Sequence, residues 1–126
     1  MHRKKILLVD DSPTALLWQR LILEDDQYEI LIATDGEEGL RVAKAEHPDL
    51  VLMDVVMPRM SGYEALRALR AEESLSGTPV LMVTTRGEMQ NVMQGYEDGC
   101  NEYITKPVDR AELLTKVRSY LQRGEN

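Results

Sequence analysis

Short apolar runs recur along the chain, at residues 6–9, 30–33, 50–53 and 80–83, with a weaker run at 103–104. None of these runs alternates regularly between apolar and polar positions. Continuous apolar runs are typical of strands buried on both faces, as in a parallel sheet. We therefore expect five short strands in one sheet that is covered on both sides.

Segments with apolar residues at helical spacing separate these runs. The first is expected to begin at Ser12-Pro13, because a serine cap followed by a proline in the first turn favours a helix start, and Leu17, Leu21 and Glu24 follow at helical spacing. The other helices are expected at residues 37–46, 63–70, 89–96 and 113–121.

Two smaller expectations concern the second and fourth of these helices. His47, in "EHPD", is interpreted as the residue that closes the second helix rather than as a ligand or a phosphohistidine. Met89, Met93 and Tyr96 of the fourth helix are expected to serve mainly in core and helix packing. For the fourth helix the alternative is a docking patch, and the exposed part of the helix could serve both roles.

The strict alternation of strands and helices predicts the fold class. Right-handed crossovers with short connections produce a parallel sheet with helices on both faces, which is an α/β architecture. Turn signals such as Asp35-Gly36, Ser61-Gly62 and Asp98-Gly99 lie at the expected boundaries. With 126 residues and no linker composition, we expect residues 1–126 to form a single domain.

Composition excludes several function classes. The 22 acidic residues outnumber the 15 basic ones, for a formal charge of −7, and no Lys/Arg block is present, so direct binding to nucleic acid is not expected. The apolar run at 6–9 is too short for a signal peptide or a membrane span, so we expect a cytoplasmic protein. A single cysteine, Cys100, is interpreted as a buried thiol in a reducing compartment.

Polar side chains follow four of the predicted strands, at the point where each strand ends. They are Asp10-Asp11, Asp54, Thr84-Thr85 and Lys106-Pro107. The carboxyl ends of parallel strands meet at one edge of the sheet, where ligands bind in such folds. Three carboxylates brought together repel one another unless a cation lies among them, and oxygen ligands of this kind suit Mg²⁺.

Such a site fits phosphoryl transfer. A carboxylate can attack phosphorus and form an aspartyl phosphate, and the transfer needs mainly positioning and positive charge from a metal ion, a lysine and a hydroxyl. Taken alone, Asp10-Asp11 could merely cap the first helix, where Ser12 is also available, and Asp54 could be a turn residue. Four coincident placements at one edge favour the functional interpretation.

The same residues resemble the receiver domains of response regulators. The similarity runs in order through "ILLVDDS", "DLVLMDVVMPRMSGYE", "VLMVTT" and "GCNEYITKPVD", and so covers nearly the whole chain. The resemblance implies a flavodoxin-like, doubly wound, five-stranded parallel sheet of order 2-1-3-4-5 with five helices. It is similar in particular to the single-domain regulators of chemotaxis.

The resemblance also implies roles for the acidic residues. Asp54 would be the phosphoacceptor, and it would share a Mg²⁺ ion with Asp10, Asp11 and the backbone carbonyl of Val56. Val56 lacks the polar side chain that relatives often carry at this position, but its backbone role would be unaffected.

Further roles follow for the last two strands. Lys106 would pair with the phosphoryl group, and its peptide bond to Pro107 would be cis. Thr84 would bond a phosphoryl oxygen through its hydroxyl and Thr85 through its backbone, although Thr85 stands where a smaller residue is usual. Tyr103 would be the aromatic residue that follows Thr84 inward when the phosphoryl group is present.

The implied partners are a histidine kinase or a histidine phosphotransfer protein, together with an unknown downstream protein that reads the face of the fourth helix, fifth strand and fifth helix. Catalysis would be limited to the protein's own phosphorylation and dephosphorylation, and we expect a monomer that binds no membrane. Two alternatives stay open at this point. One is a receiver-fold binding module that works without phosphorylation; the other is a Mg²⁺-dependent phosphatase, although that class usually carries a DxD motif after its first strand.

Overall fold

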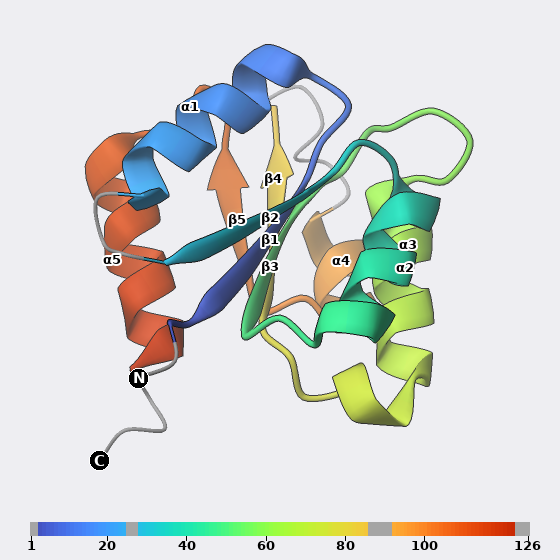
Figure 1. The fold of residues 1–126 in the computed structure, drawn as a ribbon. Helices are drawn as coiled ribbons and strands as arrows, with labels where there is room; N and C mark the ends of the chain where they lie inside the picture. The colour runs from blue at the N-terminus through green and yellow to red at the C-terminus, as the bar shows by residue number, and fades with distance from the viewer. Residues whose placement is uncertain (1–2, 25–27, 86–91, 123–126) are drawn as a thin grey trace.

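The computed structural model describes residues 3–24, 28–85 and 92–122. Its centre is a sheet of five parallel strands in the order β2-β1-β3-β4-β5, which confirms the order implied by the family resemblance (Figure 1). The strands are β1 (Lys5–Val9), β2 (Glu29–Ala33), β3 (Leu50–Asp54), β4 (Val80–Thr84) and β5 (Glu102–Thr105).

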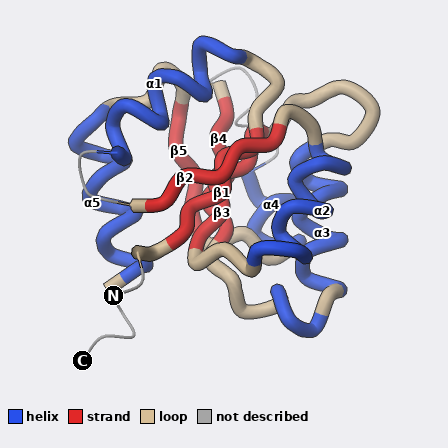
Figure 2. Tube along the Cα trace, in the orientation of Figure 1, coloured by secondary structure: helices blue, strands red, loops and turns tan. Residues whose placement is uncertain are grey.

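Helices cover both faces of this sheet. Figure 2 shows the strands as a central layer between two groups of helices. One group is α1 (Pro13–Glu24) and α5 (Arg110–Leu121); the other is α2 (Gly36–Glu46), α3 (Gly62–Ala71) and α4 (Val92–Asp98), with a short 3-10 turn, η1 (Glu73–Leu75), after α3. Within the described ranges, none of the helices is both long and apolar enough to cross a bilayer.

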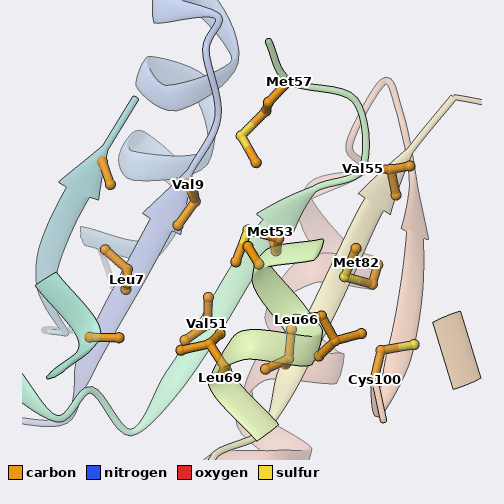
Figure 3. Packing of buried hydrophobic residues seen from close by; sticks show 14 of the residues in the cluster. Leu7, Val9, Val51, Met53, Val55, Met57, Leu66, Leu69, Met82 and Cys100 are labelled. Carbon is orange, nitrogen blue, oxygen red and sulfur yellow. The ribbon is translucent and has the colours of Figure 1, made fainter. Parts of the chain in front are cut away.

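The apolar runs of the sequence are the strands of the sheet, and their residues alternate between two cores. Leu7, Val51 and Met53 point toward α2 and α3, as Figure 3 shows for the packing on that side. The intervening residues, such as Leu8 and Leu52, belong to the second core under α1 and α5. Every residue of β3 and β4 is buried, which explains why these strands lack alternation with polar residues.

Local sequence signals set several helix ends. Asp35 caps α2 by accepting the backbone N–H of Glu38 at 2.8 Å. Ser61 and Glu64 form a reciprocal capping box at the start of α3. His47 lies just beyond α2 with φ of 48°, and its N–H donates to the last turn of the helix, so the predicted closing role is confirmed.

The side of α1 that faces the core differs from the expected one. Leu17 and Leu21 are 57% and 51% exposed, whereas Leu16, Gln19 and Leu23 are buried. The helix itself was predicted from the right period, but the segment carries apolar residues all around its axis. The pattern alone therefore could not say which stripe packs against the sheet.

The packing role expected for α4 is wrong for Met93, which is 71% exposed, and holds in part for Tyr96, which is 45% exposed but packs its ring against Tyr103. The buried residue of the helix is Gly95. Met89 lies outside the described residues. This small buried glycine lets the helix approach a bulky ring, Tyr103, on the sheet beneath it.

Candidate functional site

The acidic residues predicted to form a site lie together at the carboxyl edge of the sheet. Asp10 follows β1, and Asp54 is the last residue of the neighbouring strand β3. Asp10, Asp11 and Asp54 each offer a carboxylate oxygen, and these three oxygens lie within 4.8 Å of one another. Asp10 and Asp54 are buried and Asp11 is exposed, so the cluster is reachable from solvent on the Asp11 side.

Lys106, which directly follows β5, lies between the two buried carboxylates. Its Nζ is 2.9 Å from Asp10 Oδ2 and 3.5 Å from Asp54 Oδ1. Burial by itself would lower the pKa of Lys106, but the hydrogen bond to Asp10 and the charge of Asp54 raise this pKa above its ordinary value. The ammonium group is therefore held charged at neutral pH, directly beside the predicted nucleophile.

The negative charge of Asp54 is poorly compensated, despite this lysine. Burial raises the pKa of Asp54 to about 7, with repulsion from Asp10 adding to the effect and attraction by Lys106 opposing it. Three carboxylates face one ammonium group, which leaves an excess of negative charge at a largely buried place. An arrangement of this kind favours the binding of a further cation.

The oxygens of the cluster fit a hard divalent ion. Asp10 Oδ1 accepts the backbone N–H of Ser12 at 2.9 Å. The other oxygen, Oδ2, is buried and contacts the Lys106 ammonium at 2.9 Å, which leaves it capacity to accept a further ligand. A buried oxygen with spare acceptor capacity, next to two further carboxylates, is the donor set that Mg²⁺ prefers.

The simpler interpretation of the first acidic pair receives little support. Ser12, and not an aspartate, accepts the N–H of Ala15 at 3.2 Å through its Oγ and so caps α1. Asp10 uses one oxygen to hold the turn before the helix and presents the other to Lys106. The exposed carboxylate of Asp11 belongs to the acidic cluster.

The loop after β3 keeps the backbone beside Asp54 in a defined path. The N–H of Val55 donates to Val83 at 3.0 Å, and the N–H of Gly62 donates to Val55 at 2.8 Å. A Cβ on Gly62 would overlap the Asp54 carbonyl oxygen and lie 3.0 Å from its carbon. The side chain of Val56 is 57% exposed, which leaves only its backbone for the predicted metal ligand.

The predicted residues of β4 and β5 lie at the same edge. Thr84 is 1% exposed and its hydroxyl donates to the Thr85 carbonyl at 3.3 Å, while Thr85 itself is exposed. The peptide bond between Lys106 and Pro107 is cis, as predicted. Tyr103 is 7% exposed, and its hydroxyl lies against Gly95 of α4.

One feature beside the site was not predicted. The indole Nε1 of Trp18 in α1 donates to the carbonyl of Val108 at 2.8 Å, and so ties the first helix to the segment that carries Lys106. A hollow of about 300 Å³ adjoins this contact, and its lining residues are Ser12, Thr14, Ala15, Trp18, Gln19, Lys106, Pro107 and Val108. The available signal was the single tryptophan of the chain, six residues after the serine cap.

Comparisons with known proteins identify a family for the chain. A family model described as "Response regulator receiver domain" matches residues 6–118. Protein PilH of Pseudomonas aeruginosa is 39% identical over 117 residues, which cover 93% of this chain and 97% of PilH. The chain spans about half the length of other curated relatives that it matches, among them proteins named as transcriptional regulators.

Solved structures agree with these matches. The chemotaxis protein CheY4 of Vibrio cholerae is 32% identical, with a TM-score of 0.89 over 95% of this chain and all of that chain. The receiver domain of the sensor histidine kinase PA1611 of Pseudomonas aeruginosa is 29% identical, with a TM-score of 0.87 over 95% of this chain and 98% of that one. That structure is described as having a magnesium ion coordinated in its active site cleft.

Proposed function

Because the chain belongs to the response regulator receiver domain family, we propose that it is a phosphoacceptor switch of two-component signalling in which Asp54 takes the phosphoryl group. One observation carries the proposal: the carboxylate of Asp54 lies at the sheet edge with two further carboxylates and Lys106 around it. Residues 1–126 act as one receiver domain in this proposal.

The chemical step is a transfer from nitrogen to oxygen. A carboxylate oxygen of Asp54 attacks the phosphorus of a phosphohistidine on a histidine kinase or a histidine phosphotransfer protein. The new P–O bond forms as the P–N bond breaks, and the leaving imidazole takes a proton. Hydrolysis by water later returns the carboxylate and releases inorganic phosphate, so the only reaction catalysed is on the chain itself.

Asp10, Asp11, Asp54 and the backbone carbonyl of Val56 would hold a Mg²⁺ ion. When bound, this ion supplies positive charge to the phosphoryl oxygens. The fit rests on the excess negative charge and on the spare acceptor capacity of the buried Asp10 Oδ2 beside two further carboxylates. The related receiver domain of PA1611, which binds magnesium in its cleft, supports the same assignment.

Lys106 and the threonines complete the site. The Lys106 ammonium, 3.5 Å from Asp54 Oδ1, pairs with a phosphoryl oxygen after the transfer. The Thr84 hydroxyl, which donates to Thr85 in the unmodified chain, turns to another phosphoryl oxygen, and the Thr85 backbone N–H also contacts the group. This local change alters the face made by α4, β5 and α5, which includes Tyr103, and a downstream protein reads that face.

The proposal describes a cytoplasmic monomer that binds neither nucleic acid nor a membrane. The main alternative, a receiver-fold module that works without phosphorylation, lacks a supporting observation because the acids, the threonine and the lysine are all present at one edge.

Intact mass spectrometry tests the proposal. The protein is incubated with acetyl phosphate, with and without Mg²⁺, beside Asp54→Asn and the control Asp109→Asn, which changes a carboxylate that caps α5. We expect a Mg²⁺-dependent gain of one phosphoryl group in the wild type and in the control, but not in Asp54→Asn. If neither acetyl phosphate nor a phosphohistidine protein modifies the wild type, the proposal is wrong. Turnover of an external phosphate ester would favour the phosphatase.

A further inference from the structure

The ring of Tyr103 is enclosed by residues from two helices. Its hydroxyl oxygen lies 3.0 Å from the hydroxyl oxygen of Tyr63, the second residue of α3, in a hydrogen bond. Its ring meets Tyr96 of α4 edge-on, with the two ring centroids 5.4 Å apart and the planes at 67°. Burial, followed by this hydrogen bond, raises the pKa of Tyr103 above its ordinary value.

Gly95 provides the space that the ring occupies. A Cβ at this position would overlap the Tyr103 hydroxyl and lie 2.8 Å from the ring carbon Cζ that carries it. The same Cβ would lie 3.0 Å from a ring carbon of Tyr63. Any larger residue at position 95 would therefore force the ring of Tyr103, the helix α4 or both to move.

The hydrogen bond secures the ring in this space. A buried hydroxyl without a partner is unfavourable, so the Tyr63 hydroxyl stabilises the buried position of Tyr103 relative to a position in solvent. An ion pair of 2.8 Å between Arg67 and Asp98 also links α3 to α4. The contacts that enclose the ring come from Tyr63, Gly95 and Tyr96, and none of these contacts involves Asp54 or Thr84.

We propose that Tyr63 and Gly95 are positioning residues that hold the ring of Tyr103 buried before any phosphoryl group reaches Asp54. This inference rests on the proposed function, in which Tyr103 belongs to the face read by the partner. It adds that the Tyr103 ring already occupies its buried position in this face before phosphorylation. Phosphorylation then changes the position of Thr84 while the Tyr103 ring stays where it is.

The test measures the exposure of each tyrosine in the full chain. The five tyrosines are labelled with 3-fluorotyrosine, their ¹⁹F resonances are assigned through Tyr→Phe variants, and broadening by a soluble nitroxide reports exposure. In the unmodified wild type we expect the Tyr103 resonance to be protected. Tyr63→Phe should raise the exposed-to-buried ratio of this ring by roughly fivefold, the typical worth of one hydrogen bond.

The control is Tyr120→Phe. It also removes a hydroxyl that is bound beside β5, at 3.1 Å from both Glu102 Oε2 and the Asn101 carbonyl oxygen, and neither of these partners belongs to the enclosure of Tyr103. This variant should leave the Tyr103 resonance protected. If Tyr63→Phe and Tyr120→Phe have the same effect on that resonance, or if the ring is exposed in the unmodified wild type, the inference is wrong.

A second pair of variants tests the space under α4. Gly95→Ala should expose the Tyr103 ring, whereas Gly77→Ala, where an added Cβ meets nothing within 4 Å, should not. A Tyr103 resonance that keeps both its chemical shift and its protection in folded Gly95→Ala would contradict the proposal. If Gly95→Ala does not fold, the comparison of Tyr63→Phe with Tyr120→Phe still decides.

The same samples separate this inference from the proposed function. Treatment with acetyl phosphate and Mg²⁺ should change the Tyr103 resonance little in the wild type. The change should be larger in Tyr63→Phe, because the ring is exposed more often in that variant before phosphorylation. A large change in the wild type would overturn the inference while the mass gain at Asp54 still supports the switch. A protected ring without any mass gain would overturn the proposed function alone.

Discussion

Replacing Asp54 by Asn should stabilise the protein in the absence of metal. The buried carboxylate faces the charge of Asp10 as well as the attraction of Lys106, and the net result is a pKa of about 7. Asn has nearly the same shape as a protonated aspartate and carries no charge. The substitution therefore removes the cost of ionising this group inside the fold while the surrounding packing is kept.

The size of the effect follows from the pKa. In the unfolded chain the carboxyl loses its proton near 3.8, and in the folded chain near 7, so between these values the folded state binds more protons. Wild-type stability consequently falls as the pH rises through this window, and the full cost is present above pH 7. The resulting difference in the free energy of unfolding is about 4 kcal/mol at pH 8 and about 2 kcal/mol at pH 5.

Urea denaturation followed by circular dichroism measures this difference. Wild type, Asp54→Asn and the neutral-cap control Asp109→Asn are compared at pH 5 and pH 8 with a chelator present. Adding Mg²⁺ at pH 8 should stabilise the wild type and so reduce the difference in the free energy of unfolding between it and Asp54→Asn. The reasoning is refuted if Asp54→Asn gains less than about 1 kcal/mol at pH 8, or if its gain is as large at pH 5.

Three further predictions concern other parts of the chain. Trp18→Phe removes the indole hydrogen bond to Val108, and should lower the free energy of unfolding by about 1 kcal/mol and slow phosphoryl gain from acetyl phosphate; unchanged values of both would contradict a tethering role. Gly62→Ala places a Cβ against the Asp54 carbonyl, and should cost more than about 2 kcal/mol in urea denaturation. The Cys100 thiol is buried and burial raises its pKa to about 11, so a disulfide reagent should label it slowly at pH 8 in the folded protein and rapidly in urea; fast labelling of the folded protein would refute its burial.

Much of the fold was predictable because it depends on short-range patterns. Apolar runs such as residues 50–53 had to be strands buried on both faces, and capping residues such as Ser61 marked where helices begin. The order of these elements leaves few allowed topologies, since parallel crossovers are right-handed and short.

The site was predictable for a related reason. Residues at the carboxyl ends of buried parallel strands must meet at one edge, so the sequence alone places Asp10, Asp54, Thr84 and Lys106 together. The sequence thus determined which side chains share the edge. It did not determine that Lys106 lies closer to Asp10 than to Asp54, because that depends on the path of its side chain.

Contacts between helices were decided only by the tertiary structure. The sequence of α1 is apolar on several sides, and packing against the sheet selected Leu16 and Leu23 and left Leu17 exposed. The hydrogen bond between the hydroxyl groups of Tyr63 and Tyr103 joins residues that are 40 positions apart and lie on different elements. Such contacts depend on how whole helices are positioned over the sheet, and periodicity along one segment contains no information about its neighbour.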